Sequence, residues 1–187
     1  MDQRVLVERA GEGDHDAFAV LVRGSIARLD AAARLILRDP ELARDAVQDA
    51  LVHAWRDLPG LRDPERFDAW IHRVTVRSCL MVLRRRRRRI VEVELTSTAE
   101  GAIDDPGLHI ADRDQVERAL AHLDPGHRAV VVAHYFLGQP LPEVAAALGI
   151  PLGTAKSRLH RALASMRAEL DATSERRIAE LPRGQIA

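Results

Sequence analysis

The sequence predicts an all-α protein made of two small helical domains joined by a flexible acidic linker, and three observations support this prediction. Apolar residues recur three and four positions apart over most of the chain, which is the spacing of one helix face. Hydrophobic residues make up 47% of the sequence but aromatic residues only 3%, which favours helical cores of leucine, valine and alanine. The helical spacing is lost over residues 90–111, where glutamate, aspartate, serine, threonine, proline and glycine gather.

This loss of spacing divides the chain into parts. The predicted boundaries are 1–89 for the first domain, 90–111 for the linker, 112–170 for the second domain and 171–187 for a tail. The formal net charge is zero, but residues 84–89 are six consecutive arginines. Such a distribution indicates a segmented protein. A two-stranded hairpin from Ile90 to Leu95 is an alternative for the start of the linker, and the tail is either a short helix or disordered, with no function assigned.

Composition excludes several classes of protein. The single cysteine, Cys79, excludes an intrachain disulfide and a zinc site built from several cysteines. No apolar run approaches the roughly 18 residues that span a bilayer, and no signal peptide opens the chain. No nucleotide-binding motif or nucleophile–base pair is visible either. We therefore expect a cytoplasmic protein that has no cofactor, no metal and no enzymatic activity.

The stretch from Pro140 to Met166 has the pattern of a helix-turn-helix. Apolar residues spaced i, i+3, i+4 and i+7 from Leu141 line one helix, and Gly149 follows where a helix exit needs a left-handed residue. Thr154 can then cap a second helix with its hydroxyl oxygen. A major groove admits such a helix, whose polar face carries side chains that contact phosphates and base edges. The predicted DNA contacts of this helix are Thr154, Lys156, Ser157, Arg158, His160 and Arg161.

Aspartate, glycine and proline residues mark the helix boundaries of the first domain. Asp14 or Asp16 can cap a single long helix, in which a kink or break is possible at Gly24. The pairs Asp39-Pro40 and Asp63-Pro64 each read as an N-cap followed by the first helical residue. The first domain is therefore predicted to contain three main helices.

The second of these helices, from about Pro40 to Asp57, has an apolar face and a separate polar stripe. Asp45, Gln48 and Asp49 lie on this stripe, where carboxylates can bind a basic partner. A solvated helix face is the alternative for the stripe when it is taken by itself.

The third helix is predicted to run to about Arg89 and to end in the arginine run. Runs of this kind neutralise phosphates in nucleic-acid-binding proteins, although a solvated helix end is the alternative. Trp70, near the start of this helix, has the spacing of a core residue.

Three stretches resemble the sigma-70 family of bacterial transcription factors. Gly153 to Ala162, GTAKSRLHRA, resembles the "GTVKSRLHRAR" run that closes region 4. Leu42 to Leu58, LARDAVQDALVHAWRDL, resembles "AEDLVQETFLRAWR" of region 2.2, and Phe67 to Ile71 resembles region 2.3. Together they cover most of the chain, in the order expected of the extracytoplasmic-function (ECF) branch.

The resemblance implies the partners and the roles of the candidate residues. It implies binding to core RNA polymerase through the β′ and β subunits, recognition of −10 and −35 promoter elements, and a possible anti-sigma factor. Asp45, Gln48 and Asp49 match the positions that dock on the β′ clamp helices, and the helix-turn-helix would read the −35 element. Arg77 and Met81 depart from the usual asparagine and aspartate of region 2.3. The residues implied for the −10 element are Phe67, Trp70, Arg73, Arg77, Arg84 and Arg85.

Two other readings stay open at this point. A stand-alone helix-turn-helix regulator would bind DNA without polymerase, and an interaction module would bind protein without DNA. Under the sigma-factor reading, the flexible linker is expected to leave the two domains unfixed relative to each other in the free protein.

Overall fold

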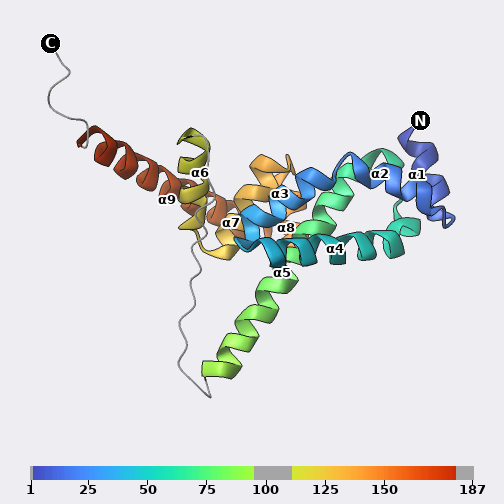
Figure 1. Cartoon of the computed structure of the whole chain (residues 1–187), viewed down its shortest axis with the longest axis horizontal. Helices are drawn as coiled ribbons and strands as arrows, with labels where there is room; N and C mark the ends of the chain where they lie inside the picture. The colour runs from blue at the N-terminus through green and yellow to red at the C-terminus, as the bar shows by residue number, and fades with distance from the viewer. Residues whose placement is uncertain (1, 95–110, 180–187) are drawn as a thin grey trace, which may run out of the picture.

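The regular elements in the described part of the chain are all helical, as the sequence predicted. The computed structural model describes residues 2–94 and 111–179, including the side chains of residues 2–88 and 115–174. Most of the predicted linker and the end of the predicted tail lie outside the described residues. The first domain contains α1 (Gln3–Gly11), α2 (His15–Arg23), α3 (Ile26–Leu37), α4 (Pro40–Asp57), the 3-10 turns η1 (Leu58–Gly60) and η2 (Pro64–Arg66), and α5 (Phe67–Glu94) (Figure 1). The second domain contains α6 (Ala111–Ala121), α7 (Pro125–Val131), the π-helical turn η3 (Val132–Phe136), α8 (Leu141–Leu148) and α9 (Leu152–Ala179).

The long helix predicted at the start of the first domain is two helices, α2 and α3, with the break at the predicted glycine. Gly24 and Ser25 separate them, since glycine destabilises a helix interior. Asp14 caps α2, because its carboxylate accepts a hydrogen bond from the Ala17 amide at 3.0 Å. That bond and the neighbouring Arg9 guanidinium lower the pKa of Asp14 below its ordinary value. Of the two predicted caps, Asp14 is therefore correct.

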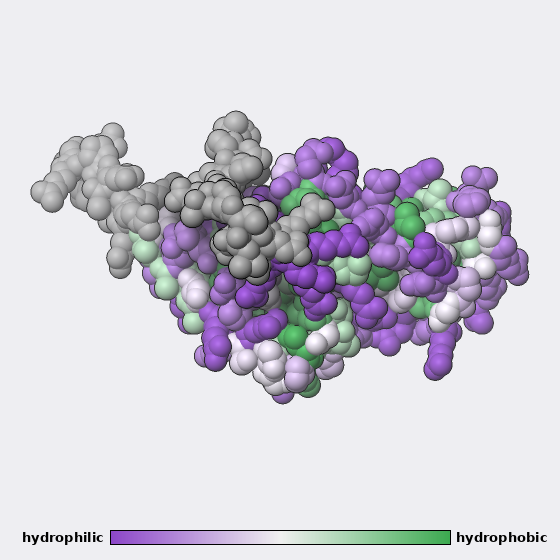
Figure 2. Space-filling model, turned by 90° about the horizontal axis from the view of Figure 1, so that it is seen from below, coloured by the Kyte–Doolittle hydropathy of each residue, from purple (hydrophilic) through white to green (hydrophobic). Residues whose placement is uncertain are grey.

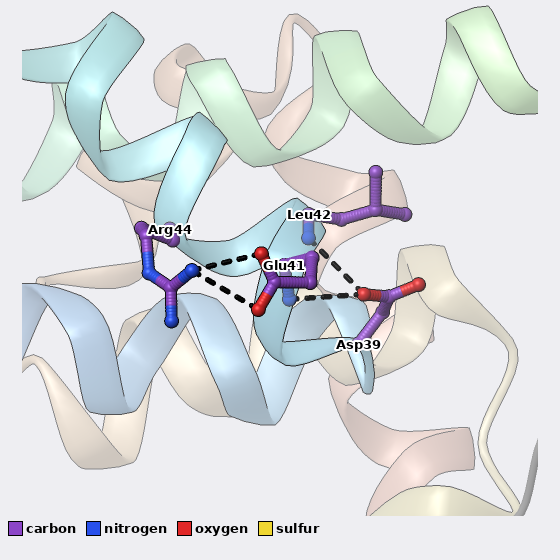
Figure 3. A network of polar contacts seen from close by, with 4 residues as sticks. All are labelled: Asp39, Glu41, Leu42 and Arg44. Carbon is purple, nitrogen blue, oxygen red and sulfur yellow. Dashed lines mark hydrogen bonds and ion pairs between the residues drawn. The ribbon is translucent and has the colours of Figure 1, made fainter.

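The start of α4 follows the prediction closely. Asp39 is extended and accepts hydrogen bonds from the amides of Glu41 and Leu42, while Pro40 occupies the first helical position (Figure 3). Arg44 binds the Glu41 carboxylate one turn later, at 2.8 Å. Local chemistry thus determines where α4 begins. The start of the helix in turn determines which side of it carries the polar stripe.

The helix α5 is the longest element of the first domain and packs against both α3 and α4. Its first turns are buried through Phe67, Ile71 and Val76. Its last turns project away from the other helices (Figure 1). Ile90 to Glu94 continue this helix, so the alternative of a hairpin over these residues is wrong.

The helix-turn-helix consists of α8 and α9. Gly149 ends α8 with a φ of 65°, which confirms the predicted left-handed exit. The predicted cap at Thr154 is wrong, because α9 begins at Leu152 and the Ala155 amide already donates to the Pro151 carbonyl at 3.0 Å. Thr154 therefore lies within the first turn of α9. This helix continues to Ala179, so the first part of the predicted tail is helical.

The two domains pack against each other, which corrects the expectation that they are unfixed in the free protein. Helix α5 contacts α8, and α3 contacts α7 and η3 as well as its own neighbour α4. One core includes fully buried residues of both domains, among them Leu29 and Ile36 of α3 and Val130 and Val132 of the second domain. The apolar surface of α3 is thus covered from both domains, and its removal from water favours their association. Figure 2 shows mainly hydrophilic residues on the part of this face that is not grey, with apolar patches between them.

Candidate functional site

The start of α9 presents the predicted DNA-reading surface to solvent. Ala155 and Ala162 are buried against the rest of the second domain. Lys156, Ser157 and His160 lie on the exposed side of the helix, together with Arg161. Their spacing by three and four residues places them on one exposed face of the helix.

Thr154 and Arg158 are less exposed than these four residues. The Thr154 carbonyl accepts a hydrogen bond from the Ser157 hydroxyl at 3.0 Å. A Cβ atom added to Gly126 would lie 3.1 Å from Nη1 of Arg158, so the Arg158 guanidinium lies directly against the start of α7. Arg158 therefore also helps to pack α9 on α7, which the sequence did not indicate.

The polar stripe of α4 is exposed, as the sequence predicted. Asp45, Gln48 and Asp49 are accessible, while Ala46 and Ala50 between them are buried. Beside Gln48 lies an open groove of about 320 Å³ between α3 and α4, which sequence analysis missed. No sequence signal indicated the groove, because Ile26, which is exposed in the structure, has the helical spacing of a core residue. The groove is lined by Ile26, Ala27, Asp30, Arg44, Val47, Gln48 and Leu51.

Of the two aromatic residues considered for the −10 element, one is buried and the other is half-buried. Phe67 is 1% exposed and belongs to the core, and Trp70 is half-buried with its ring 5.9 Å from that of Phe67. In this arrangement both rings hold the start of α5 against the other helices of the first domain. The core alternative stated for Trp70 therefore fits its position better than an exposed base-holding surface.

Four of the predicted arginines lie along α5, and the second domain contacts two of them. Arg73 binds the Glu143 carboxylate of α8 at 2.6 Å, and Arg84 approaches the Leu148 carbonyl at the end of α8, at 3.4 Å. Arg77 and Arg85 are exposed. Sequence analysis missed a further arginine at this place, because Arg66 lies in the short turn η2 before α5.

Arg66 and Arg73 both bind Glu143, and we call these three residues the Glu143 cluster. Nη2 of Arg66 pairs with Oε1 of Glu143, and Nη1 of Arg73 pairs with Oε2. The Glu143 side chain is 21% exposed, so the cluster is partly shielded from solvent. It joins residues about 70 positions apart, which no local pattern indicated.

A buried arginine also joins the domains. Nε of Arg128 donates to the Ile36 carbonyl at 2.8 Å, and its Nη1 donates to the Leu123 carbonyl at 3.2 Å. Burial lowers the pKa of Arg128 to about 10. Its guanidinium satisfies carbonyl groups at the ends of α3 and α6, where helix carbonyls have no partner within the helix. Sequence analysis missed this role, since arginine is seldom buried.

His72 and Gln139 form a second buried polar contact between the domains. Nδ1 of His72 and Nε2 of Gln139 lie 3.4 Å apart. Burial lowers the pKa of His72, the Arg28 guanidinium lowers it further, and the Asp68 carboxylate acts in the opposite direction. On balance, the surroundings therefore favour the neutral form of the imidazole.

The described residues contain neither a cluster of metal ligands nor a helix that could span a membrane. No group of three or more histidine, cysteine, aspartate or glutamate residues within them is arranged to hold a metal ion. No helix within the same ranges combines the length and apolar character needed to cross a bilayer. Cys79 is buried, and burial raises the pKa of its thiol to about 12.

Family models match both domains. The model described as sigma-70 region 2 matches residues 21–89, and the model described as sigma-70 region 4 matches residues 113–166. The matched segments lie within the two packed domains, leaving out α1 and most of α2, and the unmatched segment between them contains the predicted linker.

Individual relatives agree with these matches. The chain is 37% identical to RNA polymerase sigma-E factor of Streptomyces avermitilis over 74% of this chain and 76% of that protein. It is 35% identical to the ECF RNA polymerase sigma factor SigM of Mycobacterium tuberculosis over 82% of this chain and 77% of that protein. Among solved structures, CnrH in complex with the cytosolic domain of CnrY is 32% identical, with a TM-score of 0.63, over 91% of this chain and 99% of that chain.

Proposed function

This chain belongs to the ECF branch of the sigma-70 family, and we propose which of its surfaces binds each partner of a sigma factor. The protein is an RNA polymerase sigma factor, which directs core polymerase to promoters and supports initiation by binding promoter DNA. Sigma factors are not enzymes, and RNA synthesis is carried out by the polymerase. The assignment of individual residues to each partner is our proposal.

The acidic stripe of α4 is the proposed polymerase-binding surface. Asp45, Gln48 and Asp49 are exposed together, and the resemblance of this stretch to region 2.2 implies that they are docking positions. Opposite charges on the polymerase would steer association and fix its orientation. The groove beside Gln48 adds apolar surface at the same place, and one partner element could cover both.

The exposed start of α9 is the proposed −35 reader. Arg161 has the fork of donors that recognises guanine, while Lys156 is better suited to phosphate. Ser157 and His160 lie between them on the same face. Thr154 and Arg158 support this surface from the first turn of the helix and from the contact with Gly126.

The arginines of α5 are the proposed contacts to the −10 region. Arg77, Arg84 and Arg85 are exposed in the packed form, although Arg84, like Arg73, also contacts the second domain. Phe67 and Trp70 support this surface from inside by holding α5 in place. Phosphate contacts of this kind position a protein on DNA without reading its sequence.

We further propose a cytoplasmic location, where the polymerase is found, and a protein partner of the anti-sigma type. The relative CnrH was solved with the cytosolic domain of another protein, CnrY. This chain offers an apolar groove of about 610 Å³ between α3, α6, η3 and α9, which suits the apolar face of a partner helix. Its lining includes Leu35, Val116, Leu120, Tyr135, Leu163 and Met166.

The observation that carries this proposal is the exposure of the α9 face and the α4 stripe on two separate domains of one sigma factor. Purified protein added to bacterial core polymerase should start RNA synthesis from a cognate promoter that core polymerase alone ignores. Without polymerase, it should bind the same promoter poorly. Tight, specific binding without polymerase across a promoter library, with no initiation when polymerase is present, would instead show a stand-alone regulator.

A further inference from the structure

The Glu143 cluster has the geometry of an occupied anion site. Two guanidinium groups from the first domain meet at one carboxylate of the second domain, and each binds a different oxygen atom. Paired guanidinium groups in this arrangement also bind the oxygen atoms of a phosphate. Glu143 therefore stands where an anion of similar size and charge would bind.

The arginines of this site belong to a longer row on α5. At about 100° per residue, Arg73, Arg77 and Arg84 lie within roughly 40° of one another around the helix. Arg66 precedes them in η2 and reaches the same carboxylate as Arg73. We call Arg66, Arg73, Arg77 and Arg84 the arginine row. A row of this kind follows the direction of a nucleic-acid strand better than that of a single small anion.

Helix α8 approaches this row at both of its ends. Glu143 in its first turn binds Arg66 and Arg73, and the Leu148 carbonyl in its last turn accepts a hydrogen bond from Arg84. The carbonyl end of a helix carries partial negative charge, so both contacts present negative charge to the arginine row. A phosphate backbone and α8 would compete for the same donors.

We propose that Arg66 and Arg73 form a binding site for a backbone phosphate of promoter DNA, and that Glu143 occupies this site while the two domains are packed together. The proposal rests on the proposed function, because it takes promoter DNA as the ligand. Domain packing and DNA binding at the arginine row then exclude each other. A DNA strand that binds the row has a higher affinity for the separated domains than for the packed domains. Its binding therefore shifts the population towards the separated state.

Three variants of the full chain separate this proposal from a simple loss of packing. Glu143→Gln removes the carboxylate charge but keeps the size of the side chain and both arginines. The double variant Arg66→Gln, Arg73→Gln breaks the same two ion pairs but removes the phosphate site. Glu8→Gln is the matched control, since it removes an exposed glutamate that is paired with Arg4 inside α1, far from the cluster in sequence. Circular dichroism confirms that each variant keeps its helical content.

Two measurements are made on each variant. Spin labels on cysteines introduced at the exposed positions Val20 and Ser165 report the distance between the domains by pulsed electron resonance. Cys79 does not compete for the label, because it is buried and its thiol pKa is raised to about 12. Fluorescence anisotropy reports binding of a mixed-sequence single-stranded oligonucleotide of about 15 nucleotides, a length within the range that one binding domain covers.

We expect Glu143→Gln to increase the population of separated domains. This variant should also bind the oligonucleotide at least about threefold more tightly than wild type, because the packed form loses the stabilisation of two ion pairs. The double variant should separate the domains as well, but without the gain in affinity.

Equal gains in both variants, or separation without any gain for Glu143→Gln, would overturn the phosphate site. Unchanged label distances in both variants would overturn its occupation by Glu143. A gain of the same size in Glu8→Gln would show a general charge effect and would also overturn the proposal. None of these outcomes changes the initiation assay with wild-type protein, which tests the sigma-factor function separately.

Discussion

Nε of Arg128 donates a hydrogen bond to the carbonyl oxygen of Ile36 at 2.8 Å, although the two residues are 92 positions apart in the sequence. The bond joins the start of α7 in the second domain to the end of α3 in the first. Both residues are buried, so neither group can exchange this partner for water. A single buried side chain thus ties the packing of the domains to the stability of the chain.

Arg128→Met should therefore destabilise the folded protein. The substitution keeps an unbranched side chain but leaves the carbonyl groups of Ile36 and Leu123 buried without their donor. We expect the free energy of unfolding to fall by about 2–4 kcal/mol in urea denaturation, since each unsatisfied buried group costs about 1–3 kcal/mol. Arg34→Met is the control, because Arg34 is exposed and its guanidinium binds the neighbouring Asp30 carboxylate. Equal effects of the two substitutions would contradict the role given to Arg128.

The buried His72 predicts a dependence of stability on pH. Its pKa in the folded state lies below the ordinary value of 6.5, so the unfolded chain binds more protons than the folded chain around that pH. The free energy of unfolding should then decrease as the pH falls below 6.5, towards the folded pKa, and this contribution should be fully present above 6.5. Thermal unfolding from pH 7.5 to 5 measures the slope. His72→Gln should flatten it, and an unchanged slope in this variant would contradict the role given to His72.

The α9 surface predicts two kinds of promoter defect. Arg161→Ala should cost about 1–3 kcal/mol of specific binding and relax the sequence preference at one position of the −35 element. Lys156→Ala should weaken all promoters alike, because a phosphate contact carries no sequence information. Transcription from a series of −35 variants with core polymerase measures both effects. Equal promoter use by the Arg161 variant and wild type would remove Arg161 from the reading residues.

The α4 surface predicts a defect in polymerase binding without a defect in folding. Asp45→Lys or Asp49→Lys should reduce the affinity for core polymerase, because the new positive charge would face a basic partner surface. Pull-down with core polymerase measures the affinity, and circular dichroism confirms the helical content. Glu12→Lys, an exposed charge reversal after α1, is the control. Unchanged binding of both stripe variants would assign the stripe to solvent.

Local chemistry allowed much of this protein to be predicted from its sequence. The caps at Asp14 and Asp39, the break at Gly24 and the left-handed exit at Gly149 each depend on a few neighbouring residues. The all-helical class, the two domains and their order followed from spacing and from motifs read along the chain. These features are set by interactions within one or two helical turns, and such interactions are visible in a linear sequence.

The relation between the domains was decided only by the tertiary structure. The sequence predicted that the linker leaves them unfixed, and it offered Phe67 as a DNA contact, yet the domains share a core and Phe67 lies inside it. Arg128 and Glu143 have no pattern that separates them from ordinary surface charges. Their partners, Ile36, Arg66 and Arg73, lie 70 to 92 positions away. Such contacts depend on which helix faces fit together and exclude water, and neither shape nor desolvation can be read from local spacing.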